Sequence, residues 1–231
     1  MISVILNKYK REHLFEKQLE SINSQSIKVD EIIVVDNSKK NLGLYSRWAN
    51  AICAKNEFIC VIDDDTFPGR NWLKNCFENF EEQEGVYGAC GYLFNSDKKF
   101  ENNYIRYGSH IAPLNFQNEK RVQVDYVVHN WFLKKEWLKY YFNYIPSGKY
   151  WNCGDDMNMA IQLQKQNINC YVPPHPINDK SLWGSVESNI GIDSVSIWEA
   201  NEDNWQQTYI DFWKDGISNG WQLINSKKST I

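Results

Sequence analysis

The first hundred residues alternate between short apolar runs and segments with helical spacing, and this alternation restricts the fold more than any other feature of the chain. The runs Ile2–Leu6, Glu31–Val35 and Phe58–Ile62 are apolar and rich in β-branched residues, which is typical of buried strands. Between them, apolar residues return at three- and four-residue spacing over Arg11–Gln25 and Leu44–Ala54, as in amphipathic helices. Strands that alternate with helices predict an α/β fold with a mainly parallel sheet covered on both faces.

The later segments follow less regularly. A helix predicted over 71–83 and a strand over 86–94 continue the alternation. Beyond them the chain is polar and contains Gly108 and Pro113, which indicates a long loop over 95–121. The remaining predicted elements are a strand over 122–128, a helix over 134–144, a loop over 145–154, a helix over 155–166, a strand over 169–172 and a helix near 205–213.

Composition argues against two classes of partner. The 231 residues include 25 Lys and Arg against 29 Asp and Glu, a net charge of −4, with no block of basic residues. Duplex nucleic acid and anionic membrane surfaces are therefore not expected partners, because both bind concentrated positive charge. Aromatic residues are abundant, with 10 Trp, 13 Tyr and 11 Phe. Their flat faces suit both sugar stacking and core packing, and composition leaves both open.

Cysteine usage and hydropathy predict a soluble protein of the cytoplasm, or of the host cytoplasm if the source is viral. The six cysteines form no C-x-x-C pair and no zinc-site spacing, which favours free buried thiols in a reducing compartment. The apolar run Ile2–Leu6 is too short for a secretory signal, and no stretch approaches the ~20 apolar residues of a membrane span. The oligomeric state is left open.

Three adjacent carboxylates, Asp63, Asp64 and Asp65, directly follow the third apolar run. In open α/β sheets, ligands bind beyond the carboxyl ends of the strands. Three neighbouring negative charges there need compensation, and a hard oxygen cluster suits Mg²⁺ or Mn²⁺ that bridges to substrate phosphates. A departing diphosphate needs such a cation to balance its charge. The alternative is a solvated acidic turn that caps the following helix.

Several short motifs follow one another in a defined order: Ser3-Val4-Ile5-Leu6 with Arg11, Ser21 and Gln25; Glu31 to Ser38; Asn41-Leu42-Gly43; Ile62-Asp63-Asp64-Asp65 with Pro68; and Gly154-Asp155-Asp156 with Leu163 and Gln164. In this order they resemble the family-2 nucleotide-sugar glycosyltransferases of the GT-A fold, over about residues 2–172. The resemblance implies a single domain, 1–231. Within it, about 1–94 forms a Rossmann-like nucleotide-sugar-binding half, about 95–200 the acceptor-binding and catalytic half, and about 201–231 a helical appendage.

The resemblance implies a role for each residue of the acidic triplet. Asp65 matches a metal ligand that holds the diphosphate, Asp64 matches the position that contacts the ribose or the metal, and Asp63 belongs to the donor site. Arg47 is implied to offset phosphate charge, with a solvated surface arginine as the alternative. His175 matches in order a C-terminal histidine that is a further metal ligand in some GT-A enzymes, with a surface histidine between prolines as the alternative.

The nucleotide base is implied to bind beyond the first two strands. Asp36 could accept a hydrogen bond from N3–H of uracil, or it could be an ordinary turn residue. The loop after the first strand contributes Asn7, Tyr9 and Arg11 to the same pocket.

Asp155-Asp156 matches the acidic pair that ends in the general base of the family, where the pair is usually Glu-Asp. Asp156 is therefore implied to take the proton of the acceptor hydroxyl, with Asp155 in support. The start of a helix suits this role, and it suits a plain N-cap equally. Trp131 and Trp151 could stack on the acceptor sugar or pack in the core.

The resemblance thus predicts an inverting, Mn²⁺- or Mg²⁺-dependent hexosyl- or deoxyhexosyltransferase. It would move one sugar from a nucleotide-diphosphate sugar, with a UDP-sugar as the expected donor, to a hydroxyl of a glycan or other acceptor. No Gln-x-x-Arg-Trp motif follows the acidic pair, which favours single-sugar transfer over processive synthesis. Two alternatives remain. One is a sugar nucleotidyltransferase, although the Asn7–Arg11 loop lacks the glycines that cradle a triphosphate; the other is a carbohydrate-binding protein without catalysis.

Overall fold

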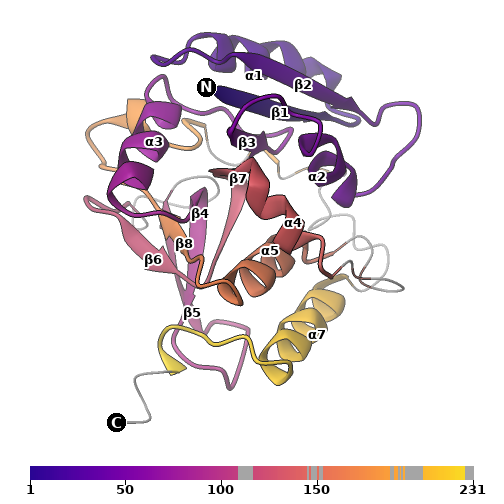
Figure 1. Ribbon diagram of the computed structural model, residues 1–231, viewed down its shortest axis with the longest axis vertical. Helices are drawn as coiled ribbons and strands as arrows, with labels where there is room; N and C mark the ends of the chain where they lie inside the picture. Colours follow the sequence, from indigo (N-terminus) through magenta and orange to yellow (C-terminus); the bar gives the residue numbers. More distant parts are fainter. Residues whose placement is uncertain are drawn as a thin grey trace.

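The computed structural model describes residues 1–108, 117–144, 146, 150, 153–187, 190–191, 193, 195 and 205–226. Within them, an eight-stranded sheet forms the centre of the molecule (Figure 1). Its strands are β1 (Ile2–Lys8), β2 (Glu31–Asp36), β3 (Phe58–Ile62), β4 (Val86–Phe94), β5 (Tyr104–Gly108), β6 (Val122–Val124), β7 (Tyr126–Lys134) and β8 (Cys170–Val172). The helices are α1 (Glu12–Asn23), α2 (Tyr45–Ala51), α3 (Trp72–Glu82), η1 (Lys135–Trp137), α4 (Leu138–Tyr141), α5 (Asp155–Gln164), η3 (Lys180–Leu182) and α7 (Trp205–Ser218).

The sheet is mixed, with most strands pointing one way. Its order is β2-β1-β3-β7-β4-β8-β6, and β5 pairs with β4 outside this path. The β2, β1 and β3 strands are parallel, and so are β4 and β8. Strand β7 lies antiparallel between β3 and β4, so these five strands share one direction while β5, β6 and β7 run against them. The prediction of a mainly parallel α/β sheet is confirmed.

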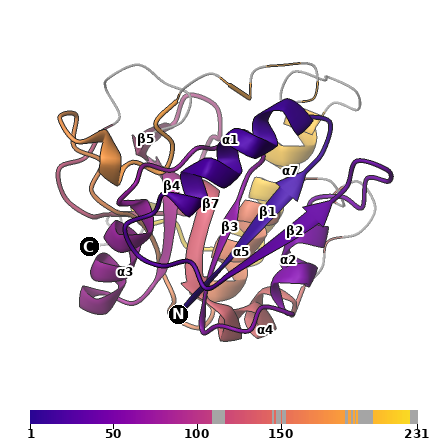
Figure 2. The same ribbon diagram turned by 90° about the horizontal axis from the view of Figure 1, so that it is seen from above.

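Helices cover both faces of the sheet. The α1 and α3 helices lie on one face, and α2, α4 and α5 lie on the other (Figures 1 and 2). Aromatic side chains fill much of the interior, and Trp48, Trp72, Trp131 and Tyr87 are each at most 1% exposed. Much of the aromatic excess therefore serves core packing, as one of the two interpretations of the composition expects.

The predicted elements up to residue 94 agree with the structure to within three residues at each end. The predicted loop over 95–121 is wrong at β5, which forms an antiparallel pair with β4. The predicted strand over 122–128 is two strands, β6 and β7, divided at Asp125. The carboxylate of Asp125 accepts hydrogen bonds from the backbone N–H groups of Phe94 (2.7 Å) and Ile224 (2.8 Å), so a buried polar side chain marks this division.

All six cysteines are free thiols. Five are buried as expected, whereas Cys53 is exposed just beyond α2. Among the described helices, none has both the length and the apolar character that crossing a bilayer requires.

Candidate functional site

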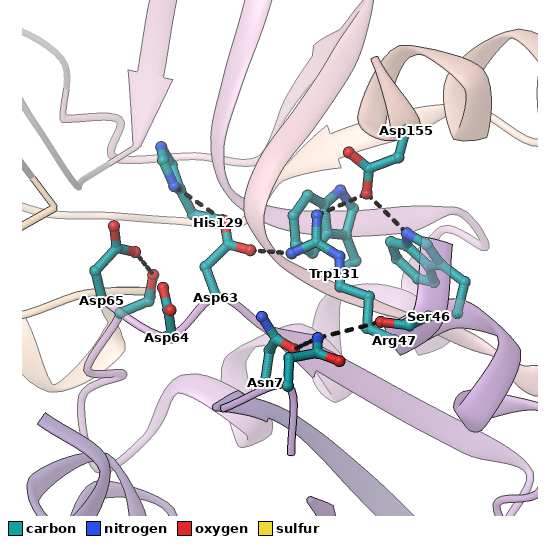
Figure 3. A network of polar contacts seen from close by, with 12 residues as sticks. Asn7, Ser46, Arg47, Asp63, Asp64, Asp65, His129, Trp131 and Asp155 are labelled. Carbon is teal, nitrogen blue, oxygen red and sulfur yellow. Dashed lines mark hydrogen bonds and ion pairs between the residues drawn. The ribbon is translucent and has the colours of Figure 1, made fainter. Parts of the chain in front are cut away.

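The candidate site lies at the edge of the sheet where β1 and β3 end and β7 runs beside them (Figure 3). The acidic turn Asp63–Asp65 leaves β3 directly, and Arg11 stands between β1 and α1. Parallel pairing of the two strands brings both segments to one edge. Gln18 of α1 holds the turn in place, because its amide donates to the backbone carbonyls of Asp63 (2.6 Å) and Thr66 (3.1 Å).

Asp63, Asp65 and His129 together have the donor atoms of a metal site. One ligand atom from each residue lies within 4.8 Å of those of the other two. His129 Nδ1 is 3.3 Å from a carboxylate oxygen of Asp63, and the Asp63 N–H donates to the His129 carbonyl over 2.9 Å. Carboxylate oxygens are hard Lewis bases and an imidazole nitrogen is a less hard one. Together they suit Mn²⁺ and are compatible with Mg²⁺. These residues therefore fit the divalent cation that the GT-A resemblance implies.

His129 reaches the acidic turn through a bulge in β7. The register against β4 shifts between Gly88 and Cys90, so that Ala89 faces two residues of β7. His129 itself has a left-handed backbone, with φ of 74°, which a non-glycine residue rarely adopts. His129 was not predicted as a ligand from the sequence. The available sign was the polar pair His129-Asn130 inside an otherwise apolar strand.

His175 is a core residue, and its prediction as a metal ligand is wrong. The ring is completely buried. Its Nδ1 lies 2.8 Å from the carbonyl of Pro173, and its Nε2 accepts a hydrogen bond from the N–H of Gly184 over 3.0 Å. Both ring nitrogens are thus used within the fold, with the proton on Nδ1. Burial lowers the pKa of His175 to about 4, so the ring stays neutral, and the surface alternative is equally wrong.

Arg11 binds the acidic turn and ties it to a segment far along the chain. Its Nη1 donates to Asp64 (2.6 Å) and to Asp65 (3.0 Å). Its Nε and Nη2 each donate to Asp193 at 2.9 Å, and Nη2 also donates to the carbonyl of Gly191 (3.2 Å). All five N–H donors of the guanidinium are therefore engaged. Arg11 was predicted for the nucleotide-base pocket, and the structure places its side chain on the acidic turn instead; Asp193 was not predicted.

Two carboxyl groups of the turn, those of Asp64 and Asp65, have raised pKa values. Burial is the largest cause for Asp64, and it raises the pKa of that group to about 7 although Arg11 opposes the shift. Burial also raises the pKa of Asp65, with the neighbouring charge of Asp63 as the second cause. A nearby cation would favour the ionised forms, so these carboxyls are prepared to bind positive charge.

Arg47 is buried and paired, which contradicts both predictions made for it. Its side chain is 6% exposed and forms ion pairs with Asp63 and, over 2.6 Å, with Asp155. The guanidinium also lies 4.5 Å from the ring centre of Trp131. A side chain held in this way is neither a solvated surface arginine nor free to meet a phosphate. Arg47 instead links the acidic turn to the start of α5 (Figure 3).

The neighbouring carboxylates Asp155 and Asp156 have different environments. Asp155 is 3% exposed, and one oxygen accepts hydrogen bonds from both Arg47 (2.6 Å) and Trp48 Nε1 (2.9 Å). Asp156 is half-buried and accepts hydrogen bonds from the Tyr209 hydroxyl (2.9 Å) and the Met157 N–H (2.7 Å). Burial raises the pKa of Asp156 to about 7, followed by repulsion from Asp155. Asp155 is therefore held by Arg47 and Trp48 in the interior, whereas Asp156 is less buried and its role as the general base stays a prediction.

The two predicted stacking residues have different outcomes. Trp131 is 1% exposed, packs edge-on against Trp48 and donates from Nε1 to the Val127 carbonyl (2.9 Å). Its prediction as an acceptor-stacking residue is wrong, and the core alternative is right. Trp151 lies outside the described residues.

The residues predicted for the base pocket gather at the ends of β1 and β2. The Asn7 side-chain oxygen accepts a hydrogen bond from Asn37 (2.9 Å), and Tyr9 is half-buried beside Lys10. Asp36 is exposed, and its carboxylate accepts hydrogen bonds from the Ser38 hydroxyl and from the Ser38 N–H (2.9 Å). Both bonds lower the pKa of Asp36, and the bond from the hydroxyl has the larger effect. Their binding of a nucleotide base stays a prediction.

The comparison with protein families bears directly on this site. The model for glycosyl transferase family 2 matches residues 38–142, a segment that contains the acidic turn, Arg47 and His129. Residues 38–142 belong to glycosyltransferase family 2. No curated protein sequence matches the chain significantly.

Solved structures agree with the GT-A fold that the resemblance implies. TarS 1–349 of S. aureus, in complex with UDP-GlcNAc, is 16% identical, with 94% of this chain and 71% of that one covered and a TM-score of 0.51. A longer S. aureus TarS chain is 18% identical at a TM-score of 0.50; 75% of this chain is covered but only 36% of that one. A197 from STIV is 13% identical; the match covers 75% of this chain and 81% of A197, with a TM-score of 0.48. At such identities the likeness concerns the fold, and this chain spans about a third of the longer TarS chain.

Replacing Arg47 by Met should lower the free energy of unfolding by about 3–5 kcal/mol, because Asp155 then remains buried without its counter-charge. Urea unfolding at pH 7 measures this loss. Arg121→Met is the matched control, since Arg121 pairs with the exposed Glu82 over 3.1 Å and should cost about 1 kcal/mol or less. Equal small losses in both variants would contradict a central role for Arg47.

Proposed function

We propose that this chain is a metal-dependent, inverting glycosyltransferase. It moves one sugar from a nucleotide-diphosphate sugar, with a UDP-sugar as donor, to a hydroxyl of a glycan or other acceptor. The observation that carries the proposal is the group Asp63, Asp65 and His129 at the carboxyl edge of β3, inside a family-2 segment. The UDP-GlcNAc bound to TarS, a protein of similar fold, supports a UDP-sugar as donor.

Asp63, Asp65 and His129 are the residues that would hold Mn²⁺ or Mg²⁺. A divalent ion bound there supplies positive charge to a departing diphosphate. Arg11 already occupies Asp64 and Asp65, so an incoming cation competes with its guanidinium for Asp65. The buried ion pairs of Arg47 keep Asp63 in position from the opposite side of the turn.

Asp156 is the general base of the proposed reaction. Its carboxylate takes the proton of the acceptor hydroxyl as the hydroxyl oxygen attacks the anomeric carbon of the donor. The bond from that carbon to the diphosphate oxygen breaks, and the nucleoside diphosphate leaves with the electron pair. One displacement on the opposite face inverts the anomeric configuration. Because the base must be ionised, the rate should rise as the pH passes upward through the Asp156 pKa of about 7.

The Asp156→Asn variant should keep donor binding and lose sugar transfer by several orders of magnitude, since an amide takes up no proton. Thermal shifts with nucleotide sugars, with and without Mn²⁺, first identify the donor. Transfer to a panel of glycan acceptors is then followed by anomeric NMR of the product. The exposed Asp97→Asn is the matched control and should transfer normally. Near-normal turnover by Asp156→Asn would place the base elsewhere, and a retained configuration would exclude single displacement.

The His129→Ala variant should weaken Mn²⁺-dependent UDP binding by about tenfold or more, because one of three ligands is lost. Isothermal titration of UDP with and without Mn²⁺ measures the change. His13→Ala is the matched control. It removes an exposed imidazole of α1 that does not belong to the ligand group, and it should leave the affinity unchanged. Identical Mn²⁺ dependence in His129→Ala and the wild type would contradict the metal assignment.

A further inference from the structure

The C-terminal helix α7 brings a tyrosine to the candidate base. The Tyr209 hydroxyl lies 2.9 Å from Oδ2 of Asp156, and the two residues are 53 positions apart in the sequence. The second oxygen of Asp156, Oδ1, accepts from the backbone N–H of Met157 over 2.7 Å. The two oxygens are thus held differently, one by a side chain from α7 and one by the backbone of α5.

A second hydroxyl stands behind Tyr209. The Tyr126 hydroxyl, from the start of β7, is 3.3 Å from that of Tyr209, and Tyr126 is only 1% exposed. An ionised carboxylate only accepts hydrogen bonds, and a phenol has one proton to donate. When Asp156 is charged, Tyr209 therefore donates to Asp156 and accepts from Tyr126. The two phenols form a short chain that ends on the carboxylate and orients it.

The helix that bears Tyr209 is firmly packed. Phe212 and Trp213 of α7 are 4% and 2% exposed, and Trp213 contacts the ring of Phe94 in β4 at 5.4 Å between centres. Phe212 lies against Gly154, the residue before α5, where a Cβ would come within 2.9 Å of the ring. Gly154 also has a φ of 69°, so two independent constraints require glycine there. The turn that presents Asp156 and the helix that presents Tyr209 are therefore packed directly on each other.

The pKa of Asp156 depends on the charged and titratable groups around it, and the hydrogen bond from Tyr209 acts on it separately from their charges. Asp155 and Arg47 are its charged neighbours, of opposite sign and paired to each other. The other titratable groups that interact with it are neutral near pH 7, because burial raises each of their pKa values: Tyr45 of α2, Tyr92 of β4, Tyr126 of β7, Tyr141 of α4 and Cys153 before α5. Hydrogen bonds from Tyr209 and Met157 are what favour the ionised form besides Arg47.

We propose that Tyr209 is a positioning residue for the reaction: it fixes Oδ2 of Asp156 and thereby directs Oδ1 toward the acceptor hydroxyl. This inference rests on the proposed function, in which Asp156 is the base. It gives the C-terminal helix a part in the site, although α7 lies outside the segment matched by the family model. The hydrogen bond also favours the ionised form of the carboxylate over the neutral form.

The test is the Tyr209→Phe variant, which removes the hydroxyl and keeps the ring. Loss of one hydrogen bond to a charged group should raise the pKa of Asp156 from about 7 to about 8. That change lowers the ionised fraction at pH 7 about fivefold. The pKa is read from the carboxyl ¹³C resonance of Asp156 in aspartate-labelled protein, assigned through its absence in Asp156→Asn. In transfer assays, the rate should fall about fivefold or more at pH 7 and by less above pH 9, where Asp156 is ionised in both proteins.

Tyr150→Phe is the matched control. Tyr150 also donates to a carboxylate on α7, that of Asp215, and packs against Phe212, so its hydroxyl binds a different carboxylate from the one that Tyr209 binds. This variant should leave the Asp156 titration unchanged. Tyr126→Phe should raise the Asp156 pKa by a smaller amount, and it provides a second test if Tyr209→Phe fails to fold.

An Asp156 pKa that is the same in Tyr209→Phe and wild type would overturn the inference. So would a loss of rate that is equal at every pH, because that pattern belongs to a merely structural role. The carboxyl titration requires no sugar transfer. If Tyr209→Phe shows the titration shift but the wild-type protein transfers no sugar, the proposed function is refuted and the contact between Tyr209 and Asp156 is not.

Discussion

The buried guanidinium of Arg47 is the interaction on which the site depends. It joins Asp63, at the end of β3, to Asp155, at the start of α5. Arg47 and Asp155 are 108 positions apart in the sequence. A buried cation of this kind is stable only while both carboxylates stay in place. Through it, the acidic turn and the helix that carries Asp156 have one fixed relation. The candidate cation ligands and the candidate base therefore belong to one rigid unit.

Concentrated negative charge at the sheet edge is compensated from two directions. Arg11 binds Asp64 and Asp65 with one nitrogen and Asp193 with two others, while Arg47 binds Asp63. Such pairing lets the carboxylates approach one another without prohibitive repulsion. The proposed cation would then join an arrangement that is already organised for positive charge.

The parts that sequence could predict depend on short-range patterns. Alternating apolar runs predicted β1, β2 and β3 with their helices, and Asp63–Asp65 after an apolar run predicted an acidic edge. Role assignments by motif order were less successful. His175 and Trp131 proved to be core residues, and Arg47 proved to be a buried link. Motif order identifies which residue types occur near a site, whereas burial and pairing depend on neighbours that are distant in sequence.

By itself the sequence determined the α/β alternation, the acidic turn and the polar start of α5, because each follows from residues within one or two turns of each other. Only the tertiary structure decided that β7 enters antiparallel beside β3, and hence that His129 meets Asp63. It likewise decided that Tyr209 reaches Asp156. The physical reason is that strand order, the β7 bulge and the docking of α7 are set by packing of the whole core. No local periodicity encodes which distant side chains that packing brings together.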